Sequence, residues 1–279
     1  YNAVRFWCNQ GVRRINAARE LSLTEIGEIA SKTSVEIEAF VHGVMCISYS
    51  GRCLLSNFMA NRDSNRGMCC HPCRFEYAVS ESRRSGQYFP LAEDERGTYI
   101  FNSRDLCMIA HVPQMISAGI TSLKIEGRMK GIHYLATTVK TYRAAIDAYL
   151  DSPGDYTPRP EWLESLGKIG NRGYCTGFYL GDPDQTLPNY AGSRMEDQHF
   201  IAKVIRQKDR HYTCVNVRNK FHTDDPVEII SAAGPDRRDC IQEIRDRNDR
   251  PVPFARPGSI VTIKLQNAGS PNDLIRKIA

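Results

Sequence analysis

The chain has 279 residues, of which 41% are apolar and 25% charged, the composition of a globular protein with a hydrophobic core. Its net charge of +5 is a mild excess, weaker than the basic footprint of many nucleic-acid-binding proteins. No run approaches the roughly 20 apolar residues of a membrane-spanning helix, and no signal peptide is visible. We therefore expect a cytoplasmic protein with no membrane partner.

Short β-like runs alternate with amphipathic helical runs over residues 1–150. Ser22 and Glu25 form a capping-box pattern at the start of the first of these helices. Alternating strands and helices predict a parallel sheet with helical crossovers. We predict strands at 12–18, 35–41, 98–101 and 122–126, and helices at 22–30, 105–118 and 133–150.

The alternation fails between Cys46 and Pro90, a stretch rich in Arg, Ser, Asn, Gly and Cys. An irregular segment of this length inside a compact domain is uncommon unless it has a function. We expect a metal centre to order it in place of a hydrophobic core.

A Pro/Gly-rich linker is expected at 151–170, between a first domain at 1–150 and a second at 171–279. Beyond the linker the period changes to short strands, FIAKVI, YTCVNV, PVEIIS and SIVTIKL, separated by turn residues. This pattern predicts a small antiparallel domain resembling a β-barrel.

Six of the ten cysteines lie between positions 46 and 107. Clustered thiols in a chain long enough to fold without disulfides indicate metal binding or redox work. Thiolates suit both iron–sulfur clusters and zinc. The long, mixed spacings differ from the two close pairs of a zinc ribbon and favour a cluster. The six are Cys46, Cys53, Cys69, Cys70, Cys73 and Cys107.

Several collinear motifs resemble those of one known family. FVHGVMCISYSGRCLLS, RDSNRG, C-x3-C-R, FNSRDLC and SLKIEGRMK follow in the order seen in the family historically called U32 peptidases, or collagenase-like proteases. The motifs are most similar to the branch of prephenate-dependent tRNA hydroxylases, which make 5-hydroxyuridine at the wobble position. This resemblance implies a [4Fe–4S] cluster, with prephenate as the co-substrate that supplies the hydroxyl group and tRNA as the partner.

The resemblance also implies the ligands and the fold. By position, the ligands are Cys46, Cys53, Cys69 and Cys107, with Cys73 the main rival to Cys69 and with Cys70 departing from the family pattern. The family fold is a (β/α) barrel of the TIM type, which needs about 250 residues. Only about 150 precede the linker, and the first residue is Tyr1 rather than Met. We therefore expect an α/β fold in which 1–150 form the second half of a barrel.

Catalytic residues of such barrels lie where strands end. Polar residues at the predicted ends are Arg19 and Glu20, then His42, then Glu126 and Arg128. Arg128, assisted by Lys124, suits the carboxylates of a dianionic substrate. The alternatives are a structural Glu126–Arg128 salt bridge and a buried, hydrogen-bonded His42.

Arginines and aromatic residues are interleaved in the cysteine-rich segment. Such mixtures suit a single-stranded RNA loop, whose bases stack on aromatic rings. Arg52, Arg62 and Arg66 are therefore candidate substrate-binding residues, although they can equally brace the loop.

Three functions remain as hypotheses. The first is an Fe–S enzyme that hydroxylates the wobble uridine of tRNA, acting alone, as a homo-oligomer or with a paired U32 subunit. The second is a U32-type, collagenase-like peptidase, although no H-E-x-x-H or G-x-S-x-G motif is present. The third is a non-catalytic RNA-binding module stapled by a cluster or by zinc.

Overall fold

The computed structural model describes residues 1–46, 48–75, 78–80, 88–90, 103–181, 200–232 and 234–278. The chain forms two compact units, each assembled from three segments. The first unit contains Tyr1–Lys130, Ala144–Arg159 and Asn171–Arg194, and the second contains Gly131–Arg143, Pro160–Gly170 and Met195–Ala279. The predicted strand at 98–101 lies outside the described residues.

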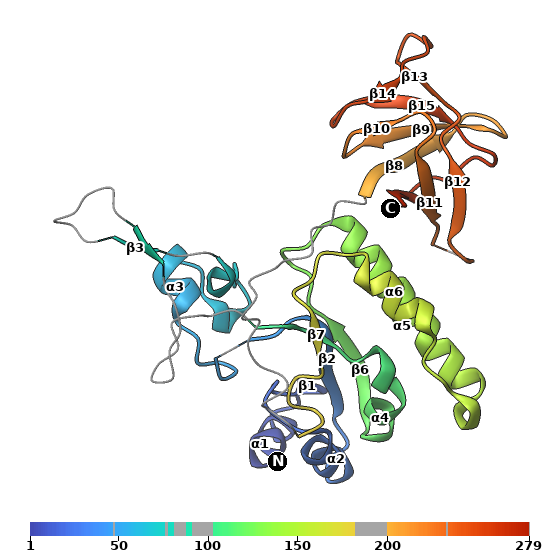
Figure 1. Cartoon of the computed structure of the whole chain (residues 1–279). Coiled ribbons are helices and arrows are strands. Elements are labelled where there is room, and N and C mark those ends of the chain that lie inside the picture. The colour runs from blue at the N-terminus through green and yellow to red at the C-terminus, as the bar shows by residue number, and fades with distance from the viewer. Residues whose placement is uncertain are drawn as a thin grey trace. The chain divides into compact units, whose positions relative to one another are not determined.

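A mixed five-stranded sheet organises the first unit (Figure 1). Its central strand, β2, runs parallel to β1 and β6 and antiparallel to β5, which in turn runs parallel to β7. Ile37, Ala39 and Val41 of β2 are almost fully buried, so this strand carries the core of the unit. The strands are β1 (Arg14–Asn16), β2 (Glu36–Val44), β5 (Asp105–Cys107), β6 (Ile120–Ile125) and β7 (Tyr174–Cys175).

The predicted helices at 22–30 and 133–150 are confirmed, whereas the helices at 2–9 and 160–167 were not predicted. The helices of this part of the chain are α1 (Asn2–Asn9), α2 (Leu23–Ser31), α4 (Val112–Ser117), α5 (Ile132–Asp151) and α6 (Pro160–Gly167), with one 3-10 turn, η4 (Pro153–Asp155), between the last two. Helix α6 and η4 lie within the segment predicted as a linker. At α2 the capping box is present, because the Ser22 hydroxyl accepts from the Glu25 N–H and the Glu25 carboxylate accepts from the Ser22 N–H.

The predicted helix at 105–118 is wrong in its first part, and so is the all-parallel sheet. Asp105, Leu106 and Cys107 form β5, and helix α4 begins only at Val112, after the 3-10 turn η3 (Ile109–His111). All three residues of β5 are buried, and pairing with β2 satisfies their backbone in the interior. An antiparallel partner needs no helical crossover. A mixed α/β sheet is therefore observed, and the half-barrel stays a prediction.

The cysteine-rich segment is built from short elements. They are α3 (Leu55–Ala60), the 3-10 turns η1 (Ser64–Arg66) and η2 (Pro72–Arg74), and the hairpin of β3 (Ala78–Ser80) with β4 (Tyr88–Pro90). Asp63 caps η1, because its side chain accepts from the Asn65 N–H at 3.0 Å. Local capping of this kind orders the segment without a regular hydrophobic period.

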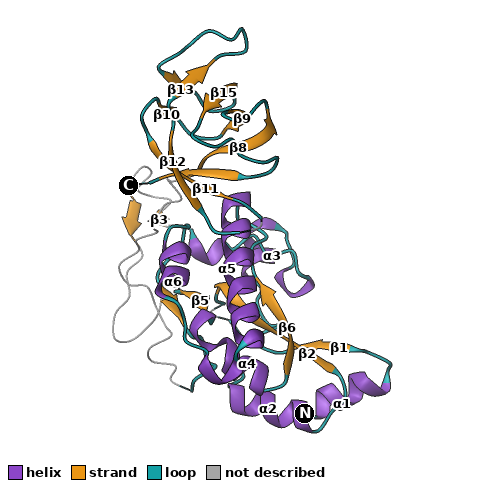
Figure 2. Cartoon of the chain, turned by 90° about the vertical axis from the view of Figure 1, so that its right-hand side faces the viewer, coloured by secondary structure: helices purple, strands orange, loops and turns teal. Residues whose placement is uncertain are grey.

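The second unit contains a seven-stranded antiparallel sheet, and Figures 1 and 2 both show it curled. The strand order is β12-β11-β16-β8-β9-β15-β13, with β10 and β14 forming a separate two-stranded ladder. Register shifts at Val204/Arg206 and Ile275/Arg276 mark bulges, which bend strands and increase twist. The strands are β8 (Phe200–Gln207), β9 (Tyr212–Val217), β10 (Phe221–His222), β11 (Pro226–Ile230), β12 (Arg237–Cys240), β13 (Glu243–Arg245), β14 (Phe254–Ala255), β15 (Ile260–Lys264) and β16 (Leu274–Lys277).

All four strands predicted for this region are confirmed as β8, β9, β11 and β15. Alternate residues of β9, including Val215 and Val217, face a core that contains Phe221, Ile229 and Ile263. The antiparallel architecture is thus confirmed, and a closed barrel stays a prediction. None of the described helices is long and apolar enough to span a lipid bilayer.

Among its described residues, the second unit has a buried arginine, Arg276. The Arg276 side chain is 1% exposed, and its Nε and Nη2 atoms lie 2.7 and 2.6 Å from Oε2 of Glu228. Burial alone raises the pKa of Glu228, but the charge and hydrogen bond of Arg276, with smaller effects of Lys168 and Arg238, outweigh burial and lower the pKa overall.

This pair predicts an acid-dependent loss of stability in the second unit. Because the folded-state pKa of Glu228 is depressed, its stabilisation is complete above the ordinary glutamate pKa of about 4.3 and disappears as the pH falls through the folded value. Glu228→Gln is expected to lower the free energy of unfolding by roughly 2–3 kcal/mol at pH 7. It is also expected to flatten the acid limb, which is the decrease of that free energy at low pH. Urea unfolding across pH 3–7 measures both effects. An acid limb unchanged in the variant would show that other carboxyl groups cause it.

Candidate functional site

Four of the six clustered thiols line one pocket of about 540 Å³ in the first unit. Cys46 follows the end of β2, Cys53 lies just before α3, Cys69 precedes η2 and Cys73 lies within η2. The pocket wall also includes the carboxyl end of β6, so it opens where two parallel strands of the sheet end.

Side-chain contacts within the segment hold Cys53 in place. Its carbonyl accepts from the Ser64 hydroxyl at 2.8 Å and from the Asn65 amide at 2.9 Å, and its N–H donates to Asn65 Oδ1 at 3.1 Å. Ser64 and Asn65 belong to η1. The sequence motif RDSNRG therefore has a structural purpose, which is to fix the backbone of a pocket thiol.

A buried arginine fastens the segment to the sheet. Arg74 is 8% exposed and donates to Asp105 Oδ1 at 2.8 Å, to the Met45 carbonyl at 3.0 Å and to the Ser103 hydroxyl at 3.1 Å. These acceptors lie next to the ends of β2 and β5. Because Arg74 directly follows Cys73, its contacts also set where that thiol lies.

The electrostatic environments of the thiols differ. Burial raises the pKa of Cys46, with further increases from Cys69 and Cys53, and it raises the pKa of Cys73 to about 11. For Cys53, burial acts in the same direction, but hydrogen bonds from the Leu55 backbone and the Ser64 hydroxyl outweigh it and lower the pKa. Cys46, Cys69 and Cys53 add small further increases to the pKa of Cys73.

Cationic side chains share the pocket with the thiols. Arg19 donates to Cys46 Sγ at 3.0 Å, and its guanidinium lies 4.1 Å from the centre of the Phe40 ring. Lys124 forms a 2.8 Å ion pair with Glu38 while lying 5.1 Å from the same ring. Arg128 is the third cation of the wall and is exposed.

Glu126 and His71 complete the polar wall. His71 Nε2 lies 3.9 Å from Glu126 Oε2, and the Arg128 N–H donates to Glu126 Oε1 at 3.1 Å. Burial is the largest influence on His71 and lowers its pKa, against the opposing effect of Glu126. The predicted pair Glu126 and Arg128 therefore lies at the pocket, in contact through the backbone N–H of Arg128.

The other predicted residues lie outside the pocket wall. His42 is 1% exposed, and burial, with a smaller effect of Lys130, lowers its pKa to about 3, so its ring is neutral at pH 7. Cys107 is buried in β5, paired in register with His42. Cys70 Sγ lies 3.4 Å from the Ser56 hydroxyl. Arg62 donates to the Met68 carbonyl at 2.9 Å and so braces the segment. Arg52 and Arg66 are exposed.

Sequence reasoning missed His71 and the anchoring role of Arg74. His71 lies between Cys70 and Pro72 and has a φ of 59°, an uncommon value that turns the chain between two thiols. Its place inside the CCHPC string was an available signal. Nothing in the sequence marks Arg74 as buried, because the residues it bonds are distant along the chain.

The thiols surround a space instead of converging on a point. A zinc ion holds its sulfur ligands at about 2.3 Å, which draws them tightly together. Within the described ranges, no group of three or more His, Cys, Asp or Glu side chains is arranged to hold a metal ion. Four thiols spread around a pocket offer the soft donor set that a multi-iron cluster takes.

Fold and site together define an α/β protein with a thiol-lined pocket at its strand ends and a second, antiparallel β unit. Residues 1–189 match the model of peptidase family U32, and residues 196–276 match that of the U32 C-terminal domain. The chain belongs to peptidase family U32, which confirms the resemblance found in its motifs.

Curated relatives carry names of two kinds. The chain is 40% identical to "tRNA hydroxylation protein P1" of Bacillus subtilis over 99% of its length, and 35% identical to "tRNA hydroxylation protein P" of Escherichia coli over 94%. It is 30% identical to a Porphyromonas gingivalis protein named "Collagenase", over 86% of the chain and 65% of that relative. The chain spans 66% of the length of the first two relatives.

Proposed function

We propose that this chain is the cluster-binding part of an enzyme that hydroxylates an RNA base, with the wobble uridine of tRNA as substrate and 5-hydroxyuridine as product. The observation that carries the proposal is the joint presence of four thiols and three cations on one pocket wall. The names of the Bacillus subtilis and Escherichia coli relatives support tRNA as the substrate.

Cys46, Cys53, Cys69 and Cys73 are the proposed ligands of a [4Fe–4S] cluster. Their donor type and their spread around the pocket fit the cluster. When bound, the cluster supplies a Lewis acid or an electron-transfer centre beside the pocket. The chain's own contribution is to hold four thiols on a braced backbone and to keep Arg19 against Cys46, where a cation favours the thiolate.

The remaining polar wall suits prephenate as the hydroxyl source. Prephenate is a dicarboxylate, and Arg128 offers a fork of N–H donors on the exposed side of the pocket. Arg19 also lines the pocket, as does Lys124, which is paired with Glu38. Glu126 and His71, 3.9 Å apart, are placed to hold or pass a proton at the His71 Nε2 and Glu126 Oε2 atoms.

This proposal predicts that Arg128→Ala raises KM for prephenate about 10- to 100-fold, because a charge-assisted hydrogen bond contributes about 1.5–3 kcal/mol. Steady-state hydroxylation with varied prephenate measures the effect. Arg66→Ala is the control, since it also removes an exposed arginine of the first unit, but one that lies outside the pocket wall. Equal KM values for the two variants would remove Arg128 from the binding site.

Mass spectrometry of tRNA nucleosides from a strain lacking the gene tests the function itself. Loss of 5-hydroxyuridine derivatives, restored by the intact gene, is the expected result. Unchanged derivatives would count against tRNA hydroxylation. Peptide cleavage that survives removal of all four pocket thiols would instead favour the collagenase-like reading.

The proposal extends to setting and assembly. The enzyme works in the cytoplasm, where thiols stay reduced and tRNA is available. A half-barrel completed by further sequence, by a second copy or by a paired U32 subunit would close the substrate side of the pocket. The sheet of the first unit has the parallel pairs β1–β2 and β2–β6 that such a barrel requires.

A further inference from the structure

A small basic cluster surrounds one aromatic ring in the second unit, at the β10–β14 ladder. Lys220 Nζ lies 4.8 Å from the centre of the Phe254 ring, and Arg256 Cζ lies 5.3 Å from it. The His222 ring lies 5.9 Å away and is tilted by 55°. Phe254 therefore gathers cationic side chains from two chain segments. We call Arg218, Lys220, His222, Phe254 and Arg256 the Phe254 patch.

A carboxylate contacts this patch at His222, whose Nδ1 lies 4.0 Å from Asp225 Oδ2, and not at its arginines or its lysine within the described residues. Segments 218–222 and 253–259 contain three Lys or Arg residues and no Asp or Glu. Arg218, Lys220 and Arg256 are exposed and form no ion pair within the described part of the chain. In the following turn, Asp225 is paired with Lys277 at 2.6 Å, and Asp224 is exposed.

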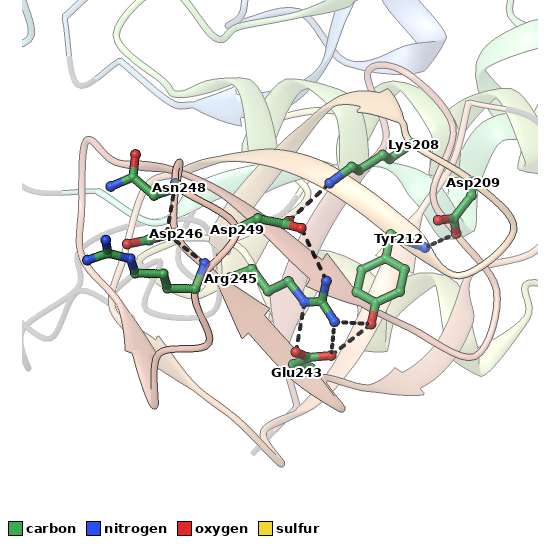
Figure 3. Close-up of polar contacts among 9 residues, drawn as sticks. Lys208, Asp209, Tyr212, Glu243, Arg245, Asp246, Asn248 and Asp249 are labelled. Atoms are coloured by element: carbon green, nitrogen blue, oxygen red, sulfur yellow. Dashed lines mark hydrogen bonds and ion pairs between the residues drawn. The ribbon is translucent and has the colours of Figure 1, made fainter.

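The opposite end of β9 is arranged differently. There the charges pair with one another, as Figure 3 shows: Arg245 bonds Glu243 at 2.8 Å and Tyr212 at 3.0 Å. Asp249 lies between Arg245, at 3.4 Å, and Lys208, at 3.1 Å. The register of β9 with β15 puts Tyr212 opposite Lys264 and Asn216 opposite Ile260, so the network and the Phe254 patch lie at opposite ends of the strand.

The backbone beneath the patch is fixed by hydrogen bonds. The Arg218 N–H donates to the Ile201 carbonyl at 2.7 Å, and the Asn219 side chain donates to the Phe200 carbonyl at 2.6 Å. On the other segment, the Gly258 N–H donates to the Val217 carbonyl at 2.9 Å. Cations held on ordered turns lose little entropy when they bind a ligand.

We propose that the Phe254 patch binds the sugar–phosphate backbone of RNA, and this inference rests on the proposed function. Exposed, unpaired cations that converge on a fixed backbone complement the repeated negative charge of phosphates. Arg256, stacked over an aromatic ring, still presents N–H donors to a phosphate. The patch positions the tRNA body and reads no base.

A lipid surface fits the patch less well. Binding in a membrane interface requires apolar side chains that enter the lipid. Among the described residues of the 195–279 segment, the large exposed apolar side chain is Ile205, which lies on β8 at the far end from the patch. Phe254 is itself covered by cations, so the patch offers charge and little apolar surface.

The inference is tested by measuring how an unmodified tRNA transcript binds to the whole chain. Fluorescence anisotropy gives the affinity at several salt concentrations. The triple variant Arg218→Ala, Lys220→Ala and Arg256→Ala is expected to raise the Kd for tRNA at least about tenfold at moderate salt. The slope of log K against log salt should fall by about 2–3, since each phosphate contact contributes about 0.7–0.9. The control variant, Arg206→Ala, Arg210→Ala and Arg247→Ala, removes the same charge from exposed positions at the other end of the sheet. It is expected to change the slope by less than one.

The inference would be overturned by an unchanged slope in the first variant, by an equal loss in the control, or by no tRNA binding by the unaltered chain. Binding to phosphatidylglycerol vesicles that depends on the patch, without binding to tRNA, would do the same. Circular dichroism and thermal unfolding confirm that both variants fold. The nucleoside analysis reports separately on hydroxylation, so a failure of the patch is distinguishable from a failure of the proposed function.

Discussion

Replacing Cys73 with serine is expected to remove bound iron and sulfide, whereas the same change at Cys70 leaves both in place. Cys73 lies on the pocket wall with Cys46, Cys53 and Cys69, and the Cys70 thiol lies against the Ser56 hydroxyl. The pair is well matched, because both thiols are partly buried and only three positions apart. Iron and sulfide assays with absorption spectra, after anaerobic reconstitution, give the result.

A variant of Cys107 distinguishes the two ligand sets that the sequence left open, in which the fourth ligand is either Cys107 or Cys73. It is buried in β5 and does not line the pocket, so Cys107→Ala is expected to retain iron at the unaltered ratio to protein. Its thermal unfolding is measured in parallel, because a buried side chain is shortened. Loss of iron from a folded Cys107→Ala variant, with retention in Cys73→Ser, would restore Cys107 as a ligand.

Replacing Arg74 with methionine is expected to destabilise the first unit by about 3–5 kcal/mol, because Asp105 is left buried without its cation. Asp105 is 1% exposed and lies 2.8 Å from Arg74. Hydrogen exchange of the β2 and β5 amides measures the loss where it occurs. The double variant Arg74→Met with Asp105→Asn is expected to recover much of the stability, since neither charge remains.

Arg66→Ala is the control for Arg74→Met. It also removes an arginine of the cysteine-rich segment, but one that is exposed, so a change within about 0.5 kcal/mol is expected. If the β2 and β5 amides were as well protected from hydrogen exchange in Arg74→Met as in Arg66→Ala, the buried ion pair would not be what fastens the segment to the sheet.

Local patterns predicted the elements whose signals are local. The capping-box pattern of Ser22 and Glu25 predicts the start of α2, and the alternation in YTCVNV predicts β9. The signal fails where tertiary packing decides. The three residues of β5 form a strand because β2 and β7 pair with them, and β12 reads RRDC, which has no strand pattern at all.

The site divides in the same way. Thiol type and clustering predicted a metal-binding segment, four of whose thiols line the pocket, and the polar end of β6 pointed to Glu126 and Arg128, which also line it. Which of Cys69, Cys70 and Cys73 line the pocket depends on the positive φ of His71 and on where Ser56 lies. The spacing of the cysteines along the sequence reveals neither. His42 was expected at the polar end of a strand, but it lies within β2, where the strand is buried on both faces.

The composition of the second unit bears on how this chain can be dissected for experiments. Ala136 packs against the cluster of Phe200, Ile230 and Leu274, and the His133 ring stacks on Phe200 at 5.4 Å. A fragment that starts near Met195 keeps the main core of the sheet but uncovers this apolar cluster to solvent. Expression of the C-terminal piece alone therefore favours self-association, and retaining the start of α5 as a covering helix gives the better-behaved sample.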